Sequence, residues 1–347
     1  MKKIIRYLLI ILLLLAALFA WLFFGPATAF SEKSKFLYIR DNEDVKTQVQ
    51  NQFESEDFIN SKWLFYLAAE RLNVWKRLKP GRFEIKKSES IYNIIRMLRN
   101  NRQSPVRLVI NKLRIREDLA RMIGKNFSTD SATAMQYLNS NDSLQVAGVD
   151  TNTVMTLVIP DTYIFNWNTP VKKVLLRLQT EKDNFWNKKD RLQKAASLGY
   201  SPEQVYTLAS IVEEETNKND EKGNIASVYM NRVSRGMLLG ADPTVKFALK
   251  NFALKRLYYG HLEVESPYNT YRYKGLPPGP ICTPSATTID AVLNAPKTDY
   301  IFFVAKPDFN GYHNFSTTYA EHEKYAKQYQ QALNEWQAKQ AQKQAAP

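Results

Sequence analysis

A long apolar run opens the chain. Residues 1–6 supply three basic side chains, and residues 7–25 then pass without a charge. At a rise of ~1.5 Å per residue, a helix of this length nearly spans a hydrocarbon core ~30 Å thick. Because the basic flank is expected to stay cytoplasmic, residues 1–30 are predicted to form a cytoplasmic tip and a transmembrane anchor. The alternative is a cleavable signal peptide, since residues 27–29 read ATA, but such signals usually have an apolar region of only ~7–15 residues.

Alternating and helical patterns between residues 35 and 110 predict a small module of strands and helices. Its clearest segment is an amphipathic helix at 88–102, with Ser88 as the expected N-cap and with Ile91, Ile94, Ile95 and Leu98 on one face. The other predicted elements are strands at 35–40, 79–85 and 105–110 and helices at 45–53 and 61–78.

Beyond this module the pattern remains a mixture of helices and short extended segments. The predicted elements are helices to about residue 138, loops at 139–143 and 148–153, and a lysine-rich helix at 171–192. The PDTYIF segment at 160–165 begins the second half of the chain. Residues 336–347 are low in complexity, which is typical of a frayed helix or a tail. No internal repeat is visible, and the mixed order of elements predicts an α+β fold.

Three consecutive glutamates end a helical segment that reads LASIVEEET. The helix is expected to start at Ser201 as N-cap, with Pro202 at its first position and Gln204 completing a capping box. At 100° per residue, Glu214 falls about 180° from the apolar stripe, facing solvent, whereas Glu213 and Glu215 fall about 80° to either side of it. A half-buried carboxyl at such a border has the raised pKa that a general acid needs. A solvated acidic helix end is the alternative interpretation.

Composition narrows the classes of partner. The net charge is +14, from 48 basic and 34 acidic residues, which favours a polyanionic partner. No nucleic-acid-binding motif accompanies the charge, so nucleic acid is not expected. Cys282 is the only cysteine, which excludes an intrachain disulfide and a cysteine-rich zinc site. His261, His313 and His322 lack the close spacing of metal ligands, and neither a metal nor an organic cofactor is predicted.

Several long motifs then follow in order. They read NIASVYMNRVSRGMLLGADPTVKFAL at 224–249, ESPYNTYRYKGLPPGPICTPS at 265–285, DYIFFVAK at 299–306 and HNFSTTYAEH at 313–322. Together with LASIVEEET, this series resembles the YceG-like endolytic murein transglycosylases (MltG type), which are membrane-anchored bacterial enzymes that cut nascent peptidoglycan strands. The resemblance covers about residues 160–322.

The resemblance implies a role for each glutamate. In that family the first glutamate of the string is catalytic and the second position varies, which corresponds here to Glu213 and Glu214. Glu215 is then a supporting residue that orients its neighbours. Glu213 would protonate the glycosidic oxygen between N-acetylmuramic acid and N-acetylglucosamine. It would next take the proton of the muramyl C6 hydroxyl, which gives a 1,6-anhydro end and terminates strand elongation.

The same motifs imply a set of substrate-binding residues whose amides, hydroxyls and rings suit sugar recognition. They are Asn231, Asp242, Thr244, Tyr268, Asn269, Thr270 and Tyr271. A structural role in loops is the alternative for each of them. The GLPPGPI segment is expected to form a rigid wall, and His313 is expected to be structural.

The implied organisation has five parts: the anchor at 1–30, a LysM-like glycan-binding module at 35–110, a helical connection at 111–160, a mixed α+β catalytic domain at 161–335 and a tail at 336–347. The protein would be a single-pass protein of the cell inner membrane with a periplasmic catalytic domain. Its partners would be peptidoglycan glycan strands and peptidoglycan synthases. Two other functions stay open: a muramidase-type hydrolase that uses Glu213 with a second carboxylate and water, and a non-catalytic peptidoglycan-binding scaffold.

Overall fold

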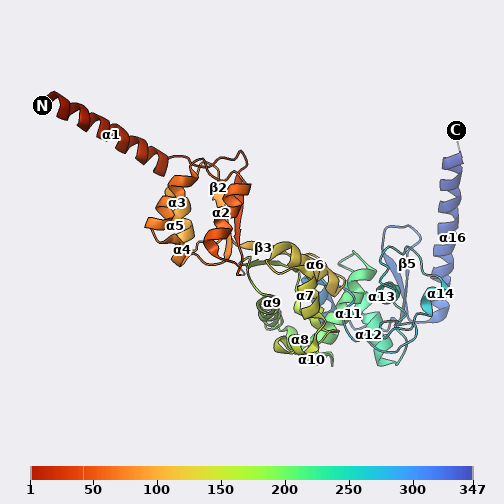
Figure 1. Cartoon of the computed structure of the whole chain (residues 1–347). Helices are drawn as coiled ribbons and strands as arrows, with labels where there is room; N and C mark the ends of the chain where they lie inside the picture. The colour runs from red at the N-terminus through yellow and green to blue at the C-terminus, as the bar shows by residue number, and fades with distance from the viewer. Residues whose placement is uncertain (1, 42, 346–347) are drawn as a thin grey trace. The chain divides into compact units, whose positions relative to one another are not determined.

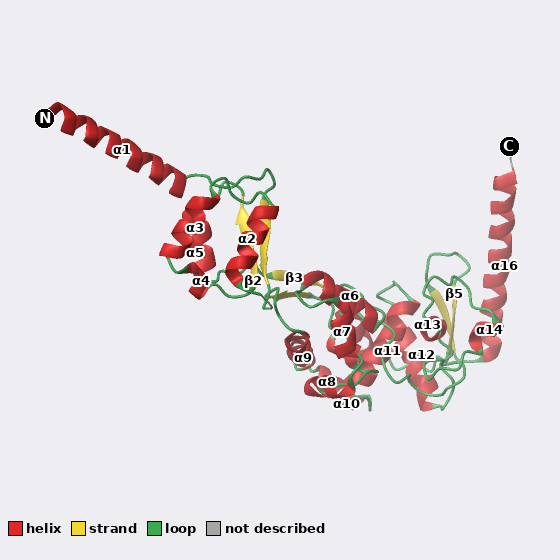
Figure 2. Ribbon diagram, in the orientation of Figure 1, coloured by secondary structure: helices red, strands yellow, loops and turns green. Residues whose placement is uncertain are grey.

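The computed structural model describes residues 2–41 and 43–345. Helices predominate, and the described strands form two-stranded ribbons (Figure 2). The pairs are β1 (Ser34–Ile39) with β2 (Gly81–Lys86), β3 (Val106–Val109) with β4 (Thr162–Phe165), and β5 (Phe302–Ala305) with β6 (His313–Ser316). This mixture confirms the predicted α+β class.

The chain divides into two compact units. The first unit comprises the chain up to Leu108 together with Gly124–Asp130 and Tyr163–Pro170, and the second comprises Val109–Ile123, Ser131–Thr162 and the chain from Val171 onward. The predicted helical connection at 111–160 is therefore shared between the units. The boundaries predicted from the sequence stay a prediction.

Helix α1 (Lys2–Phe24) confirms the predicted N-terminal apolar helix (Figure 1). Its segment Lys3–Phe24 is long and apolar enough to cross a membrane, and none of it is buried within the protein. Both a membrane anchor and a secretion signal have these properties.

The segment that follows α1 is part of the core of the first unit. Ala27 N donates to Glu89 O (3.0 Å), and Asn60 N donates to Ala27 O (2.8 Å). Ala27 and Phe30 are buried within the same apolar cluster as the strands. The ATA sequence that resembles a cleavage site therefore lies in folded, hydrogen-bonded structure.

A pair of strands and the helices that accompany it form the body of the first unit. β1 runs antiparallel to β2, with Ser34 opposite Lys86 and Ile39 opposite Gly81. Between the two strands in sequence lie α2 (Val45–Ser55), α3 (Lys62–Arg71) and α4 (Val74–Arg77), and after β2 comes α5 (Ile91–Arg99). The predicted apolar face of α5 is confirmed, because Ile91, Ile94, Ile95 and Leu98 are all buried in this core.

Three local predictions are wrong. Ser90 caps α5 in place of Ser88, because Ser88 has a left-handed φ of 63° and its side chain makes no cap. The helix predicted at 61–78 breaks at Asn73, which has a φ of 52°. The loop predicted at 139–143 contains the start of a short helix, α8 (Asn141–Leu144), which Ser140 caps by accepting a hydrogen bond from Ser143 N.

Several helices lie between β3 and the candidate site in sequence. They are α6 (Arg116–Asn126), α7 (Ser131–Leu138), α8, α9 (Val171–Trp186) and α10 (Arg191–Ser197), with short 3-10 turns at Gln145–Ala147 and Val154–Leu157. The helix predicted at 171–192 is interrupted before α10, where Lys189 and Asp190 have left-handed φ values of 58° and 55°.

The core of the second unit is built around α11 (Pro202–Glu215). Buried residues of α11, α12 (Lys222–Ser234) and α15 (Ala286–Leu293) belong to one apolar cluster. Two short helices, α13 (Asp242–Ala248) and α14 (Tyr259–Leu262), lie between α12 and α15 in sequence. The β5–β6 ribbon contacts α16 (Tyr319–Ala345), a long helix that includes most of the predicted tail.

Candidate active site

The start of α11 fixes the register of the three glutamates. Ser201 Oγ accepts a hydrogen bond from Gln204 N (3.2 Å), and Gln204 Oε1 accepts one from Ser201 N (2.8 Å). Pro202 occupies the first turn. These reciprocal bonds satisfy backbone amides that have no partner inside the helix, and they confirm the predicted capping box.

Helix α11 is buried on every side. Residues 205–212 are all buried, including polar ones. Tyr206 Oη donates to Val158 O (2.5 Å), and Ser210 Oγ accepts a hydrogen bond from Ile281 N (3.0 Å). Because buried polar atoms are expensive to leave unpaired, these bonds hold the helix in one position, and with it the glutamates of its last turn.

Glu213 is held through one of its two carboxylate oxygens. Its Oε2 lies 3.0 Å from the Nζ atom of Lys222 and accepts hydrogen bonds from Ser285 Oγ (3.2 Å) and from Thr288 Oγ1. Lys222 also donates to Thr288 Oγ1 (2.6 Å). Lys222 and Glu213 are nearly buried, with side chains 6% and 17% exposed. We call Lys222, Ser285 and Thr288 the Oε2 site.

The Oε2 site includes the beginning of α15. Ser285 is the N-cap of that helix, and its Oγ accepts a hydrogen bond from Thr288 N (3.3 Å). Helix N-termini stabilise negative charge through their dipole and their free amides. One ammonium group, two hydroxyls and a helix N-terminus thus surround one oxygen of Glu213.

The second oxygen of Glu213 is free to act. Within the described chain, no side chain or backbone group donates a hydrogen bond to Glu213 Oε1. The contacts at Oε2 therefore orient the carboxylate, and Oε1 can still form a hydrogen bond with a substrate. A single oriented carboxylate with one free oxygen can give a proton to a bound substrate and take one back.

The prediction for Glu214 is wrong. Its side chain is only 18% exposed and forms ion pairs with Lys112 (2.5 Å) and Arg114 (3.3 Å). Although burial opposes ionisation, the contacts with these two cations lower the pKa of Glu214. The angular argument assumed that α11 has one apolar face and one wet face, whereas the segment before α6 covers the side that was assigned to solvent.

Glu215 lies in a second, separate polar group. Tyr229 Oη donates to Glu215 Oε1 (2.5 Å). Burial raises the pKa of Glu215 to about 7, and the charge of Asp242 adds to this effect against the hydrogen bond from Tyr229. Burial and the nearby Glu215 carboxyl also raise the pKa of Tyr229. The predicted supporting role of Glu215 stays a prediction, and its contact with α12 is the geometry that would serve it.

Four of the predicted substrate-binding residues make internal hydrogen bonds. Asn231 Nδ2 donates to the carbonyls of Thr298 (2.7 Å) and Tyr300 (2.9 Å). The side chains of Thr244, Asn269 and Thr270 are almost completely buried. Thr244 Oγ1 lies 2.8 Å from Thr270 Oγ1, and Asn269 Nδ2 donates to Leu262 O and Val264 O. These side chains shape loops, and a direct contact with substrate would require the loops to open.

The other three residues of that set are more accessible. Asp242 is exposed, and its Oδ1 accepts a hydrogen bond from Tyr271 Oη (2.6 Å). Burial, together with the Asp242 carboxylate, raises the pKa of Tyr271. Tyr268 packs against Phe247, with ring centroids 4.6 Å apart. Their substrate contacts stay a prediction.

His313 makes a structural contact. Its backbone N donates to Glu221 Oε1 (2.7 Å), and its Nδ1 lies 3.1 Å from Glu221 Oε2. The ring also meets the edge of Phe303. These contacts join β6 to the start of α12, next to Lys222 of the Oε2 site.

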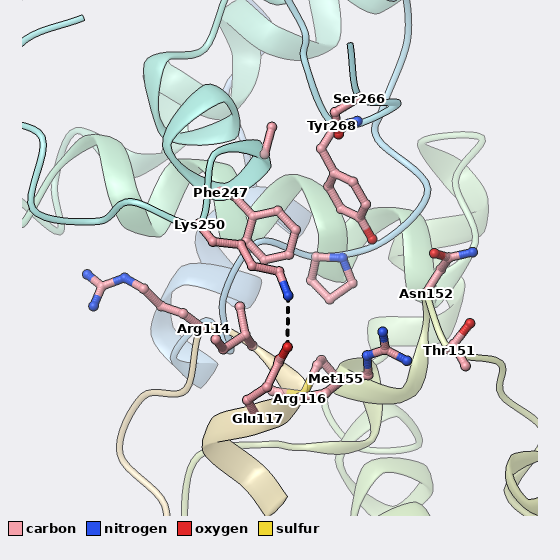
Figure 3. A pocket seen from close by; sticks show the side chains of 13 residues that line it. Arg114, Arg116, Glu117, Thr151, Asn152, Met155, Phe247, Lys250, Ser266 and Tyr268 are labelled. Carbon is pink, nitrogen blue, oxygen red and sulfur yellow. Dashed lines mark hydrogen bonds and ion pairs between the residues drawn. The ribbon is translucent and has the colours of Figure 1, made fainter. Parts of the chain in front are cut away.

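A pocket of about 210 Å³ is lined by residues from the start of α6 and the end of α13, among others (Figure 3). Its aromatic side consists of Phe247 and Tyr268, and its charged side includes Lys250 and Glu117, which form an ion pair at 2.8 Å. Pro280, from the predicted GLPPGPI wall, also lines it. Glu213 does not line this pocket.

The sequence analysis missed the Oε2 site. Lys222, Ser285 and Thr288 lie 9, 72 and 75 residues from Glu213 in sequence. The one local signal was Ser285, an N-cap residue that follows a proline and precedes a helical pattern. Nothing in that pattern tells which carboxylate the helix N-terminus would meet.

Comparisons with known proteins agree on the class. A profile of the YceG-like family matches residues 37–328, and the chain therefore belongs to the YceG-like family. A crystal structure of a yceG-like protein from Listeria monocytogenes is similar to the chain with a TM-score of 0.56 and 25% sequence identity, covering 85% of this chain and 99% of that chain.

Two curated relatives carry the name endolytic murein transglycosylase. The one from Bacillus subtilis (strain 168) is 41% identical over 135 residues, which is 39% of this chain and 37% of that protein. The one from Streptococcus pneumoniae serotype 2 (strain D39 / NCTC 7466) is 29% identical over 152 residues, 43% of this chain and 27% of that protein. The matches thus span well under half of the length of these relatives.

Proposed function

We propose that this protein is an endolytic peptidoglycan lytic transglycosylase that uses Glu213 as its acid and base. The observation that carries the proposal is the arrangement of Glu213, whose Oε2 is bound by the Oε2 site and whose Oε1 is free. The proposal is supported by membership of the YceG-like family and by the names of the curated relatives.

In the proposed reaction, Glu213 gives the proton on Oε1 to the oxygen that links muramic acid C1 to N-acetylglucosamine. The C1–O bond breaks, and the muramyl C6 hydroxyl forms the new bond to C1. Glu213, now a carboxylate, takes the proton that this hydroxyl loses. The product is a 1,6-anhydromuramyl end, and no water is consumed.

The Oε2 site has a role in both steps. Lys222 and the hydroxyls of Ser285 and Thr288 hold the carboxyl group in one orientation. This lowers the entropic cost of reaching the reactive geometry. The ammonium group and the N-terminus of α15 also stabilise the carboxylate that exists between the two proton transfers. Such prearranged charges act strongly because the site is nearly buried.

The predicted substrate-binding residues divide into two groups in this proposal. Tyr268, Tyr271 and Asp242 would contact the sugar, because they are exposed or half-buried. Asn231 is also half-buried, but its amide is bound to the carbonyls of Thr298 and Tyr300. Asn231 and the other three residues of the set would keep the neighbouring loops in place through the hydrogen bonds described above. Glu215 would act as a supporting residue through its bond with Tyr229.

The first unit would place this activity at a membrane. We include in the proposal a single-pass anchor formed by α1, with an exported catalytic domain in the periplasm and peptidoglycan synthases as partners. The pairing of β1 with β2, with α2, α3 and the short α4 between them in sequence, supports a LysM-like module that holds glycan. The net charge of +14 would favour a polymer that carries carboxylates.

The test uses the full chain in liposomes that carry lipid-linked nascent glycan strands. The parent should release products with anhydromuramyl ends, and Glu213→Gln should reduce the rate by a factor of ~10² or more. Glu214→Gln is a matched control on the same helix turn, and it should retain most of the activity if it folds. Cleavage by the Glu213→Gln variant at the parental rate would reject the proposed role of Glu213.

A failure of the parent to cut would favour the scaffold alternative. Residues 25–30 must stay in the protein that is tested, since Ala27 and Phe30 belong to the core of the first unit. Circular dichroism of each variant should match that of the parent, so that a lost activity is not a lost fold.

A further inference from the structure

The pocket that Phe247 and Tyr268 line has more basic than acidic side chains in its lining. Arg114, Arg116 and Lys250 line it, and Glu117 is its acidic side chain. Lys250 is paired with Glu117 at 2.8 Å, and Arg114 is paired with Glu214 at 3.3 Å. Each of these two cations therefore already has a carboxylate partner.

Arg116 is different. Its Nη1 donates to Leu138 O (3.2 Å), and in the part of the chain that the structure describes no carboxylate lies within ion-pair distance of its guanidinium. The side chain is half-buried at the pocket wall. A guanidinium has donors in a planar fork, which suits a carboxylate held by two parallel hydrogen bonds.

The other side of the pocket is apolar. The rings of Phe247 and Tyr268 pack 4.6 Å apart on this side (Figure 3). Pro280 and Met155 are further apolar residues of the lining. A volume of about 210 Å³ is below the roughly 300–1,000 Å³ of sites for drug-sized ligands. The pocket is therefore suited to one or two amino-acid residues and is small for a disaccharide.

Two non-covalent contacts connect residues of the pocket lining, or their neighbours in sequence, to α11. Its residue Arg114 binds Glu214, the sequence neighbour of Glu213. Its residue Pro280 precedes Ile281, whose amide is bound to Ser210 of α11. A ligand in the pocket would thus lie against segments that hold the helix of the acid.

We propose that this pocket binds a carboxylate of the peptide stem that branches from the glycan strand, with Arg116 as its anion-binding residue. The inference rests on the proposed function, because it assumes a peptidoglycan substrate. The sugars of the backbone are uncharged where the stem is attached, so a cationic pocket distinguishes the stem from the sugar. The ring of Phe247 would contact the small side chains of the stem.

The first experiment compares two polymers. The full chain is given uncrosslinked strands with intact stems. It is also given strands whose stems an amidase has removed and whose freed lactyl carboxylates have then been amidated, and kcat/KM is measured for each. The ratio of kcat/KM for stem-bearing over stripped strands should fall about tenfold in Arg116→Gln, mainly through KM, since a charge-assisted bidentate contact is lost. Arg121→Gln is the matched control, because Arg121 lies on the same helix, is largely exposed and does not line the pocket.

The result that overturns the proposal is a ratio in Arg116→Gln equal to that of the parent, whether or not the overall rate changes. An equal loss on both polymers would mean that Arg116 acts through its bond to Leu138 O, as a structural residue. Arg116→Lys, which keeps the charge and loses the fork, should restore part of the ratio.

A binding measurement keeps the proposal separate from the proposed function. The tetrapeptide L-alanyl-γ-D-glutamyl-L-lysyl-D-alanine is titrated into the full chain in nanodiscs, together with the same peptide with both carboxyl groups amidated. Saturable binding of the free acid, weakened about tenfold by amidation and by Arg116→Gln, supports the subsite even if the parent cuts no strand. Equal binding of both peptides, or no binding, rejects it.

Discussion

Glu215 gives the sharpest quantitative prediction. Its carboxyl is buried near Asp242, and the pKa is raised to about 7 from the ordinary value of 4.5. The substitution Glu215→Gln keeps the shape of the side chain and an oxygen that can accept the hydrogen bond of Tyr229 Oη. It removes only the charge that the folded protein disfavours.

The magnitude follows from the pKa difference between the folded and unfolded states. The raised value of about 7 against 4.5, at ~1.4 kcal/mol per pKa unit, corresponds to an upper bound of about 3 kcal/mol. Partial access of water reduces this figure to about 2 kcal/mol. The folded protein binds more protons than the unfolded chain between pH 4.5 and 7, so the Glu215 contribution to the free energy of unfolding falls as pH rises through this window.

Hydrogen exchange of the amides of α11, followed by mass spectrometry, measures the predicted difference. Parent and Glu215→Gln are compared at the same pH, so that the intrinsic exchange rate cancels. The variant should match the parent below about pH 4.5 and gain about 2 kcal/mol in opening free energy above about pH 8. A difference that does not change with pH would refute the assignment of a raised pKa to Glu215.

Three further outcomes are expected. Glu214→Gln should lower the opening free energy of α11 by about 1 kcal/mol at neutral pH. This loss should shrink as pH falls through the lowered pKa of the Glu214 carboxyl. A loss that grows in acid would contradict the two ion pairs of Glu214. Lys222→Met should lower kcat by roughly 10²-fold with KM little changed, because the ammonium group orients the catalytic carboxyl, and steady-state kinetics with a parental circular dichroism spectrum would check this. Phe30→Ala should destabilise the first unit by about 3 kcal/mol and speed its proteolysis without speeding that of the second unit, since the ring lies in the first core.

Local patterns predicted α11 well. The capping box at Ser201 and Gln204 and the helical position of the three glutamates follow from residues within one turn of each other. The solvent-facing position of Glu214 failed because periodicity describes one helix and its own apolar stripe. It carries no information on Lys112 and Arg114, which reach the opposite side from a segment about 100 residues away in sequence.

The partners of Glu213 could not be predicted for the same physical reason. Ser285 and Thr288 meet the carboxylate only because α15 packs against α11. The helix pattern led us to expect a partly buried Glu213, and its side chain is 17% exposed, but the pattern could not tell which of its oxygens stays free.

The end of the N-terminal segment could not be predicted from its hydrophobicity either. Hydrophobicity alone placed a boundary near residue 30, whereas Ala27 and Phe30 pack into the first unit and Ala27 bonds to Glu89 and Asn60. Those partners lie 30 to 60 residues downstream, and their positions depend on the whole module. Capping of α5 by Ser90 instead of Ser88 likewise depends on the left-handed turn that β2 imposes before the helix.

The central claim is that Glu213 cuts glycan without consuming water, and one measurement tests it most directly. Nascent strands are cut by the full chain in water enriched in ¹⁸O, and the new muramyl ends are analysed by mass spectrometry. The account predicts unlabelled ends that are one water lighter than reducing ends, formed by the parent and not by Glu213→Gln. Reducing muramyl ends that carry ¹⁸O would contradict it and would identify the protein as a hydrolase.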